Sequence, residues 1–483
     1  MLRNGATDRV AFIAQRYDLI IVGMGSGGMV AAEFASTLDL KVAAVERDRV
    51  GGDCLWTGCV PSKALLASAK VAHHMRTADA FGIAAVEPQV DTRKVWERIR
   101  GVQRSIADTD DDPARYEEMG IEFHYGPATL TGPNTVRVGD QEELEGRFIL
   151  LCTGSRPVEP PIDGLAEAGY LTSENIWDLE KAPASLVAIG GGPISVEMSQ
   201  AFTRLGIETH TLQRGSRILP RDQPELVKVL VDKLRGEGLD LCLGVDVEKV
   251  TVEDGMKVVH GTQDGASRSW RGEDILVGVG RRPNAEGLGL EEVGIETNRR
   301  GVTIDERSRT TVPSVYAVGD LGGRYLFTHS AGYEAARAVR DMFFPGKGKF
   351  TSFVPWCTFT DPELAHAGLT LQEAEEAHGS DEVEIWRQDL IHSDRARAEG
   401  VPEGAIIVVT AKKKVVGAHI LAPAAGEMIH ELALAMQQGM KLDDVASLIH
   451  VYPTVSIAIG QLAGESAFES AQRYRWLVKR TKG

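Results

Sequence analysis

The pattern that most constrains the fold of this chain is a strand, glycine-loop and helix unit. Residues 17–22 (YDLIIV) form an apolar, β-branched run, and GMGSGG and an alanine-rich helical segment follow it. Gly23, Gly25 and Gly28 occupy the GxGxxG positions, where glycines permit a tight turn and let the backbone approach a pyrophosphate. Glu46 ends the next apolar run, close to the spacing of about 20 residues expected of a carboxylate that accepts from ribose hydroxyls. The unit therefore predicts a dinucleotide site.

The same unit occurs a second time. An apolar run at residues 186–189 leads into GGGPIS, a helical segment and a further strand at residues 207–213. Gly190 and Gly192 match the motif, whereas Ser195 replaces its third glycine. That position serves helix–strand packing and not phosphate contact, so we expect a second dinucleotide site despite the replacement.

The end of the second unit's second strand predicts which nicotinamide nucleotide binds. An acid there would bind the ribose 2′-hydroxyl of NADH, whereas an arginine would accept the 2′-phosphate of NADPH. The residues present are Gln213, Arg214 and Arg217. Because guanidinium groups match phosphate geometry and no acid is present, the site favours NADPH.

Composition excludes several classes of function. The chain has 483 residues and a net charge of −16, which disfavours nucleic acid and anionic membrane surfaces as partners. No run approaches the roughly 20 apolar residues of a membrane span, and the first residues lack a signal peptide, so we expect a cytoplasmic protein. Five cysteines in a chain of this length do not form a secreted disulfide scaffold.

Two of the cysteines form a close pair. Cys54 and Cys59 precede Pro61 and an unbroken helical run, which places the second sulfur at a helix N-terminus. The helix dipole and its N–H groups favour the thiolate, the form that attacks disulfides or binds soft metals. A zinc site is the rival interpretation, but no further ligands lie nearby in the sequence, so we predict no metal site. The remaining cysteines are expected to be buried small hydrophobes: Cys152, Cys242 and Cys357.

Seven motifs occur in one order along the chain: GMGSGG, GGDCLWTGCVPSKAL, LCTGSRP, GGGPISVE, GVGRRPN, VYAVGD and FTDPELAHAGLT. Together they resemble the pyridine nucleotide–disulfide oxidoreductases, the flavoenzyme family of lipoamide dehydrogenase, glutathione reductase and mercuric reductase. The resemblance runs from about residue 17 to residue 464. It implies FAD in the first unit, a nicotinamide in the second and a homodimer whose active site the partner completes. Electrons are then expected to pass from NAD(P)H through flavin to a Cys54–Cys59 disulfide.

The fold class expected is α/β, with two Rossmann-like dinucleotide-binding domains and a C-terminal α+β dimerisation domain. From about residue 347, alternating runs such as AIIVVTA and VVGAHILA predict an antiparallel sheet, with Lys412–Lys414 in a solvated hairpin turn. The expected organisation is an N-terminal tail (1–16), an FAD-binding domain (17–156), an NAD(P)-binding domain (157–280), a second FAD-binding part (281–345) and the dimerisation domain (346–483).

Roles carry over from the resemblance position by position. Cys59 resembles the flavin-proximal sulfur and Cys54 the interchange thiol that faces substrate. Lys63 and Glu197 match an ion pair near flavin N5, where a cation stabilises the reduced anionic flavin. Asp320 matches the acid that binds the sugar alcohol chain of FAD. The same motifs supply the other expected cofactor contacts: Ser26, Gly52, Thr153, Gly154 and Gly280.

The C-terminal region departs from the disulfide reductases. Their His-x-His-Pro-Thr-x-Ser-Glu pattern carries a catalytic His and the Glu that orients it, but this chain reads HVYPTVSI. Tyr452 replaces the His and Ile457 the Glu, which leaves His450 as the noncatalytic first His. Acid–base catalysis is worth about 10²–10⁴-fold, so we expect poor turnover of lipoamide or glutathione disulfide. Tyr452 either donates a proton to the acceptor or only fills the gap.

Mercuric reductases also place a tyrosine here, because a soft cation held by two thiolates needs no imidazole to protonate a leaving thiol. We therefore expect a mercuric reductase-like enzyme with a metal-ion or small-molecule acceptor. Two alternatives stay open. The flavin could reduce quinones or other electrophiles directly, or the protein could be a flavin-bound interaction protein with a basic tail at residues 473–482. Asp53 and Trp56 also depart from the family, and either select a substrate or repack the redox loop.

Overall fold

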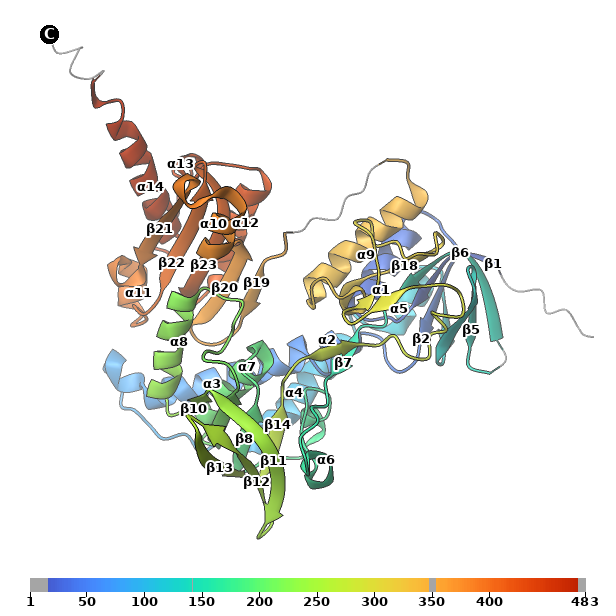
Figure 1. Ribbon diagram of the computed structural model, residues 1–483, viewed down its shortest axis with the longest axis horizontal. Coiled ribbons are helices and arrows are strands. Elements are labelled where there is room, and N and C mark those ends of the chain that lie inside the picture. The colour runs from blue at the N-terminus through green and yellow to red at the C-terminus, as the bar shows by residue number, and fades with distance from the viewer. Residues whose placement is uncertain (1–15, 141, 347–352, 477–483) are drawn as a thin grey trace, which may run out of the picture. The chain divides into compact units, whose positions relative to one another are not determined.

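The computed structural model describes residues 16–140, 142–346 and 353–476 (Figure 1). All but the last residue of the expected N-terminal tail (1–16), and the end of the basic tail (473–482), lie outside these ranges. The chain divides into two compact units. Unit 1 comprises Met1–Trp56, Gln103–Arg156 and Arg281–Phe350, and unit 2 comprises Thr57–Val102, Pro157–Gly280 and Thr351–Gly483.

Unit 1 is built on a seven-stranded sheet with a parallel core. The strands follow the order β3-β2-β1-β6-β5-β4, and β18 also pairs with β6. β1, β2, β3, β6 and β18 run parallel, and β4 and β5 add an antiparallel edge. The strands are β1 (Arg16–Val22), β2 (Val42–Glu46), β3 (Ile121–Tyr125), β4 (Ala128–Gly132), β5 (Thr135–Val138), β6 (Glu142–Leu151) and β18 (Val315–Ala317).

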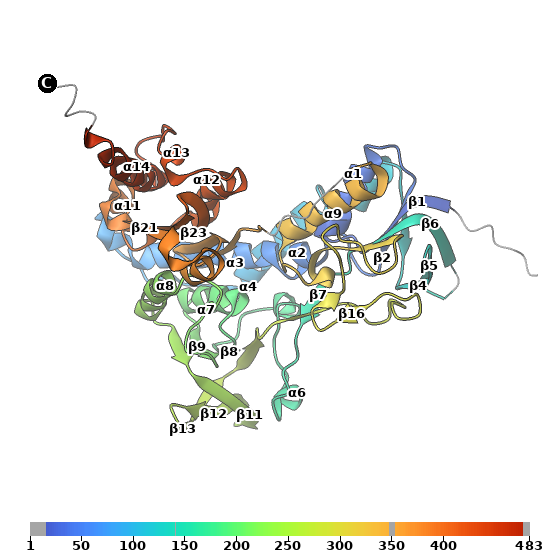
Figure 2. The ribbon, with the colours of Figure 1, turned by 45° about the horizontal axis from the view of Figure 1, so that its top comes forward.

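The central strands of this sheet are apolar and buried, as is typical of parallel strands, so helices must cover both faces. α1 and α9 lie side by side in both ribbon views (Figures 1 and 2) and share a core with β1 and β2. The remaining elements of unit 1 are short. The helices and strands are α1 (Ser26–Ser36), α2 (Gly52–Trp56), α5 (Pro113–Glu118), α9 (Thr328–Phe343), η3 (Gly319–Gly322), β15 (Arg281–Pro283), β16 (Thr297–Asn298) and β17 (Gly301–Val302).

Unit 2 contains a second parallel sheet, in the order β10-β9-β8-β14, beside an antiparallel sheet of β11, β12 and β13. The strands are β8 (Ser185–Ile189), β9 (Glu208–Gln213), β10 (Asp240–Leu243), β11 (Val245–Glu253), β12 (Met256–Gln263), β13 (Ala266–Gly272) and β14 (Asp274–Val277). The helices of this region are α3 (Cys59–Arg76), η1 (Ala78–Phe81), α6 (Leu165–Ala168), η2 (Ile176–Asp178), α7 (Pro193–Arg204) and α8 (Pro224–Gly236). α4 (Thr92–Ala107) and β7 (Ser155–Pro157) cross the unit boundary. Both expected dinucleotide-binding units therefore have the Rossmann-like strand–helix–strand arrangement.

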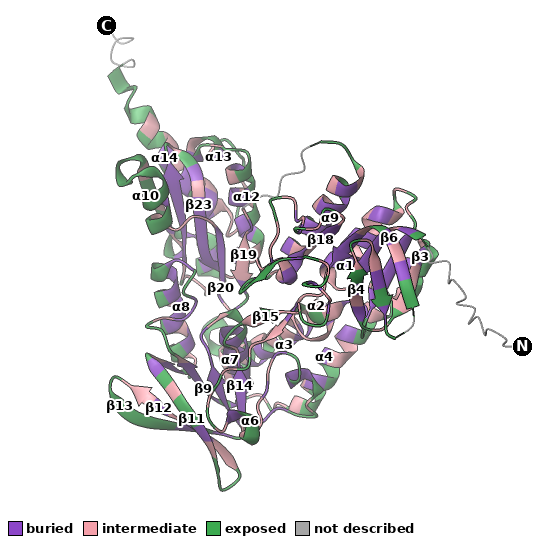
Figure 3. Ribbon diagram, turned by 45° about the vertical axis from the view of Figure 1, so that its right-hand side comes forward, coloured by how far each residue is buried: buried purple, intermediate pink, exposed green. Residues whose placement is uncertain are grey.

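The C-terminal part of unit 2 has the expected antiparallel sheet, in the order β19-β20-β23-β22-β21. Every residue of β22 is buried, because α12 and α14 pack on one face of the sheet and α8 on the other. The neighbouring strand β23 is largely purple in Figure 3. The strands are β19 (Trp356–Thr358), β20 (Glu363–Gly368), β21 (Val383–Asp389), β22 (Ala405–Ala411) and β23 (Lys414–Ala422). The helices are α10 (Leu371–His378), η4 (Ser380–Glu382), η5 (Leu390–His392), α11 (Asp394–Ala398), α12 (Ala425–Gln437), α13 (Leu442–Val445) and α14 (Ile457–Gln472). Lys412 and Lys413 form the β22–β23 turn with positive φ.

Two histidines are buried opposite one another in this sheet. His366 on β20 pairs with His419 on β23, and their Nδ1 atoms lie 3.1 Å apart. The Nε2 of His366 contacts the Gly368 carbonyl at 2.9 Å, and the Nε2 of His419 contacts the Leu369 carbonyl at 3.1 Å. Burial lowers the pKa of both imidazoles well below the usual range, because neither charged form is solvated.

This pair predicts acid sensitivity of the C-terminal sheet. Both folded-state pKa values lie below the unfolded value of about 6.5, so the unfolded chain binds more protons as the pH falls. The stabilisation is present above about pH 6.5 and is lost below it, by about 1.4 kcal/mol per pH unit for each histidine. Thermal unfolding measured between pH 5 and 7 should show that stability changes less steeply with pH in His419→Gln than in the wild type. Equal slopes would contradict this assignment.

Candidate active site

The first glycine loop leaves no room for side chains. A Cβ on Gly28 would lie 1.9 Å from the Gly23 carbonyl oxygen, so the turn from β1 into α1 closes only with hydrogen at that position. Gly23 itself has φ +97°, and a Cβ there would lie 2.6 Å from the Cys152 carbonyl oxygen. Gly25 in turn lies against Gly52, where a Cβ would come within 2.8 Å of the Gly25 Cα. The bare backbone at the start of α1, which begins with Ser26, suits close approach of a pyrophosphate.

Two carboxylates border this loop in unit 1. Glu46, the last residue of β2, accepts from the Met24 N–H at 2.7 Å and the Asp48 N–H at 2.8 Å. Asp320 lies in η3 directly after β18 and accepts from the Ser155 hydroxyl. Burial raises the pKa of Asp320, although the Ser155 hydrogen bond and the charge of Arg281 oppose the rise. We call the first glycine loop with Glu46 and Asp320 the cradle. It combines glycine backbone that a phosphate can approach with carboxylates that can accept from sugar hydroxyls, which fits the FAD expected here.

Neighbouring residues hold the cradle in shape. Thr153 donates from its hydroxyl to the Asn284 carbonyl at 2.9 Å, and the Asn284 amide donates back to the Thr153 carbonyl at 2.9 Å. Gly154 adopts φ +68°, and its carbonyl accepts from the Asn284 N–H at 3.0 Å. These contacts tie the end of β6 to the chain that returns after residue 280.

Arg281 joins this cradle to the redox segment within unit 1. Its guanidinium donates to the Ser155 hydroxyl at 2.7 Å and lies 3.7 Å from Asp320. It also lies 3.2 Å from the carboxylate of Asp53, which immediately precedes Cys54. Sequence analysis quoted Arg281 in GVGRRPN but assigned it no role, and it left Asp53 unexplained. The ion pair gives Asp53 a structural role at the start of α2.

Trp56 is likewise fixed by its surroundings. Its indole N–H donates to the Val50 carbonyl at 2.8 Å, and the Arg49 guanidinium lies 4.2 Å from its ring centroid. The amide of Gln103 donates to the carbonyls of Leu55 and Trp56 at 3.2 and 2.8 Å. These contacts favour repacking of the redox loop over substrate selection as the role of Trp56.

The two redox cysteines lie on successive helices. Cys54 is half-buried in α2, and Cys59 is exposed as the first residue of α3. Pro61, within the first turn of α3, is buried and lacks the N–H that this turn could not use. The position of Cys59 at the N-terminus of an 18-residue helix favours its thiolate, because the helix N–H groups and dipole are positive there.

Lys63 and Glu197 form a close ion pair between α3 and α7. The Lys63 Nζ lies 2.9 Å from a carboxylate oxygen of Glu197, whose side chain is only 7% exposed. The other Glu197 oxygen accepts from the Phe359 N–H at 2.8 Å. Burial alone disfavours the charged lysine, but the carboxylate of Glu197 and the negative charge of Cys59 outweigh it and raise the pKa of Lys63. Lys63 therefore stays protonated and favours the Cys59 thiolate in return.

The second glycine loop tolerates Ser195 for a structural reason. Gly190 has φ +120°, and a Cβ on it would lie 2.4 Å from the Gly278 carbonyl oxygen. The Ser195 hydroxyl fills the space beside Gly278, donates to its carbonyl at 3.4 Å and would lie 2.2 Å from a Cβ there. The side chain of Ser195 therefore fits because residue 278, which lies next to it, is a glycine without a side chain. Apart from the chain neighbours of Gly192, no described residue has a heavy atom within 4 Å of a Cβ at this position, which leaves the start of α7 open for a nucleotide.

The residues expected to select NADPH differ in their contacts. Gln213 ends β9, and its amide donates to the Arg217 carbonyl at 3.1 Å. The Arg217 guanidinium donates to the carbonyls of Pro220 and Asp222, so backbone groups occupy it. Arg214 is exposed. Gly280, the last residue of the Pro157–Gly280 segment of unit 2, adopts φ +143°.

The segment at residues 450–457 lies in the C-terminal part of unit 2. The His450 side chain is 7% exposed and lies 3.0 Å from Glu431, while its Nδ1 faces the Leu448 carbonyl at 3.2 Å. Tyr452 is exposed, and its hydroxyl donates to Asp394 at 3.1 Å, which raises the pKa of the phenol. Ile457 begins α14. Sequence analysis missed Glu431 and Asp394, because no motif links them to these partners.

Of the other cysteines, Cys242 is buried as expected, whereas Cys152 and Cys357 are only half-buried, each packed against an apolar cluster. Burial raises the pKa of all three thiols, Cys152, Cys242 and Cys357, and so disfavours their reactive thiolates. Among the described residues, no three His, Cys, Asp or Glu side chains are arranged to hold a metal ion. No helix in the described part of the chain is long and apolar enough to cross a membrane.

Comparisons with known proteins agree with these features. A family model described as pyridine nucleotide-disulphide oxidoreductase matches residues 17–335, and the dimerisation domain of the same family matches residues 354–463. A dihydrolipoyl dehydrogenase of Thermus scotoductus is 35% identical over 92% of this chain and 96% of its own length. A mercuric reductase of Bacillus cereus is 31% identical over 91% of this chain and 70% of its own length.

A solved structure is also similar. The HOCl-induced flavoprotein disulfide reductase RclA of Escherichia coli has a TM-score of 0.82 and 26% identity, over 93% of this chain and 99% of its own. A Cu(II) complex of that protein matches with the same TM-score, identity and coverage.

The pairing of Ser195 with Gly278 gives a direct test of the second loop. We expect Gly278→Ala to lower the free energy of unfolding by about 1–3 kcal/mol, because the new methyl group overlaps the Ser195 hydroxyl. In a Ser195→Gly background the same change should cost at least about 1 kcal/mol less. Denaturant unfolding of the four proteins in this cycle measures the difference, and strict additivity would show that the two residues do not share the space.

Proposed function

The chain belongs to the pyridine nucleotide-disulphide oxidoreductase family, and we propose that it is an NADPH-dependent enzyme that reduces a thiophilic metal ion through Cys54 and Cys59. Members of this family are flavoproteins that use FAD and a pyridine nucleotide. FAD, when bound, supplies two-electron transfer between the reduced nucleotide and a disulfide. The first glycine loop, Glu46 and Asp320 are the groups proposed to hold it, for the steric reasons given above.

The residues around the cysteines favour thiolate chemistry. Cys59 lies at the start of α3, and Lys63 provides a cation that interacts with its negative charge. Glu197 holds that ammonium in place at 2.9 Å. Two thiolates, from Cys54 and Cys59, would bind a soft cation more tightly than oxygen ligands could. Lys63 and Glu197 then act as the charged pair that stabilises negative charge beside the redox centre.

The observation that carries the proposal is the set of contacts made by His450 and Tyr452 in the segment at residues 450–457. Disulfide reductases need an imidazole, oriented by a carboxylate, to protonate the leaving thiol. Here His450 is buried against Glu431 with both ring nitrogens in contact with protein groups, and the phenol of Tyr452 donates to Asp394. Other protein groups thus hold both side chains, an arrangement that does not suit protonation of a leaving thiol. An acceptor that needs no protonated leaving group suits this site, and a thiophilic metal ion is such an acceptor.

The names of two relatives support this choice of acceptor. One relative in sequence is a mercuric reductase, and one in structure was solved as a Cu(II) complex. Other relatives are dihydrolipoyl dehydrogenases, which act on a dithiol substrate by name. The replacement of the imidazole and carboxylate by Tyr452 and Ile457 separates this chain from the chemistry of the latter group.

We also propose NADPH as the reductant and a homodimer as the working form. Arg214 is the guanidinium best placed by its exposure to meet a 2′-phosphate, because Arg217 is occupied by backbone carbonyls. Ile449 and Val451 are 94% and 76% exposed, beside an open groove of about 790 Å³. Exposed apolar side chains on a dimerisation domain suit contact with a second copy, which would complete the active site.

The acceptor is tested by NADPH oxidation with Hg(II), Cu(II), lipoamide, glutathione disulfide and a quinone. We expect the metal ions to be reduced at least about tenfold faster than either disulfide, given the size of the missing acid–base contribution. Cys54→Ser should abolish metal reduction and spare quinone reduction, whereas Cys242→Ala should leave both intact. Metal reduction that survives Cys54→Ser would instead favour direct reduction by the flavin. Lack of any NADPH-dependent flavin bleaching would favour a protein without turnover.

The missing dyad gives a second test. Tyr452→His alone should leave lipoamide reduction near background. The imidazole would bind Asp394, as the phenol does now, and would not be oriented toward the substrate. Tyr452→His combined with Ile457→Glu should raise lipoamide turnover at least about tenfold by restoring an orienting carboxylate. Steady-state rates with lipoamide and with Hg(II) measure the difference. Equal gains in the single and double variants would refute this account of the substitution.

A further inference from the structure

Three polar side chains on one face of α7 bind a turn of the C-terminal domain through hydrogen bonds and an ion pair. Glu197, Gln200 and Arg204 are spaced three and four residues apart, so they share one side of the helix, and each is at most 5% exposed. Fully buried polar groups of this kind require partners, because an unsatisfied one is costly. All three find them in residues 359–361, the turn between β19 and β20.

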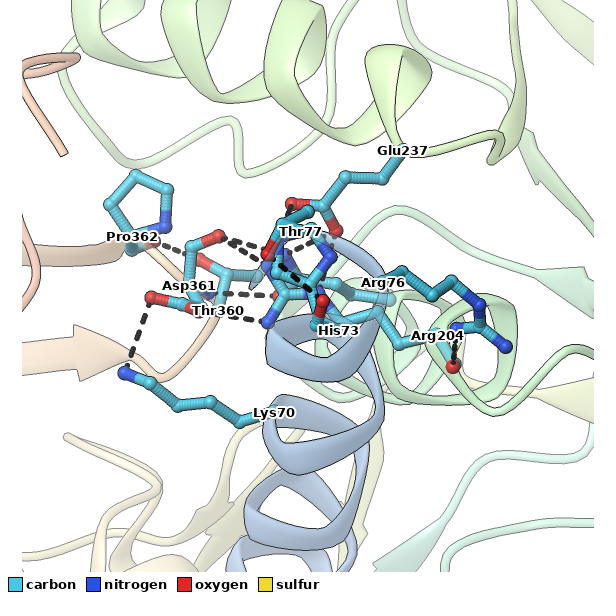
Figure 4. Close-up of polar contacts among 10 residues, drawn as sticks. Lys70, His73, Arg76, Thr77, Arg204, Glu237, Thr360, Asp361 and Pro362 are labelled. Carbon is cyan, nitrogen blue, oxygen red and sulfur yellow. Dashed lines mark hydrogen bonds and ion pairs between the residues drawn. The ribbon is translucent and has the colours of Figure 1, made fainter. Parts of the chain in front are cut away.

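The far end of this row is an ion-pair network (Figure 4). The Arg204 guanidinium contacts Glu237 at 2.6 Å and the Asp361 carboxylate at 2.8 Å, and Lys70 approaches the same carboxylate at 3.4 Å. These cations lower the pKa of Asp361 despite its burial. Gln200 accepts from the Asp361 N–H at 2.8 Å and donates to its carbonyl at 2.9 Å. The turn is therefore fixed through both its backbone and its side chain.

The near end of the row reaches the redox pair through Phe359. The Phe359 N–H donates to Glu197 at 2.8 Å, while the Lys63 Nζ lies 4.4 Å from the centroid of its ring. One residue thus contacts both members of the ion pair. A cation over an aromatic face is attracted by the ring quadrupole, which restrains an otherwise flexible lysine. The Lys63 side chain is 38% exposed, so without the ring its ammonium can turn toward water.

We propose that Phe359 is a positioning residue that holds the Lys63 ammonium at the redox centre, with the Gln200 and Arg204 contacts fixing the turn that carries it. The inference rests on the proposed function, in which Lys63 lies beside the flavin. A displaced ammonium stabilises the reduced flavin less well. Phe359 therefore sets how readily the enzyme-bound flavin accepts electrons.

The test is the two-electron potential of the bound flavin in four variants of the holoenzyme. Phe359→Leu keeps the N–H donor and much of the volume but removes the aromatic face. We expect it to lower the equilibrium constant for flavin reduction by about threefold to tenfold, the upper figure corresponding to about 30 mV more negative. Phe359→Tyr retains the ring and should match the wild type. Phe81→Leu, at a 59% exposed phenylalanine of η1, is the matched control and should also match it.

Lys63→Met separates this inference from the proposed function. If Lys63→Met leaves the potential unchanged, Lys63 is not beside the flavin and the role of Phe359 fails with it, whereas metal reduction through Cys54 and Cys59 is decided separately by Cys54→Ser. If Lys63→Met lowers the potential while Phe359→Leu does not, only the role of Phe359 is overturned. A second readout is the NMR signal of isotopically methylated Lys63, whose upfield ring-current shift should disappear in Phe359→Leu and persist in Phe359→Tyr. An unshifted wild-type signal would also overturn the contact.

Discussion

The constraint on which the rest of this structure depends is the contact between backbone segments at the two strand-to-helix turns. At Gly28 a single carbon atom would lie 1.9 Å from the carbonyl of Gly23, and at Gly190 one would lie 2.4 Å from that of Gly278. Each turn brings a helix N-terminus against the carboxyl end of a parallel sheet, where N–H groups can receive phosphates. Both sheets, and the carboxylates and guanidiniums around them, are arranged about these turns.

Charge compensation organises the polar groups within each unit. In unit 1, Arg281 links Asp320 of the first cradle to Asp53 beside Cys54. In unit 2, Glu197 fixes Lys63, and the same helix face anchors residues 359–361. Each of the charged groups named here has a partner, which is the condition for keeping charged groups out of water. The departures at Asp53 and Trp56 fit this scheme, since both residues form specific contacts that hold the redox segment.

The core of the C-terminal domain lies apart from Tyr452 and Ile457. Its antiparallel sheet is buried between α8 and the helices α12 and α14, and Val455 is the residue of the 450–457 segment that packs against this core. Tyr452 is exposed and Ile457 begins α14, and neither residue belongs to the core cluster of this sheet. The His450 imidazole lies 3.0 Å from the carboxylate of Glu431, and His450 also lines the open groove of the C-terminal domain.

The sequence by itself determined the two dinucleotide-binding units and the close cysteine pair at a helix start, because glycine spacing, cysteine spacing and hydrophobic period are local properties. The family resemblance adds the expectation that Tyr452 and Ile457 stand in place of an acid–base pair. Only the tertiary structure decided which charges meet. Arg281 meets Asp53 and Asp320, Asp394 meets Tyr452, and Phe359 meets Lys63 and Glu197, across separations that no local pattern encodes. Arg217 is expected from the sequence to meet a phosphate, and in the folded chain its guanidinium donates to the carbonyls of Pro220 and Asp222. Such pairings depend on side-chain direction and burial, which exist only once the elements pack.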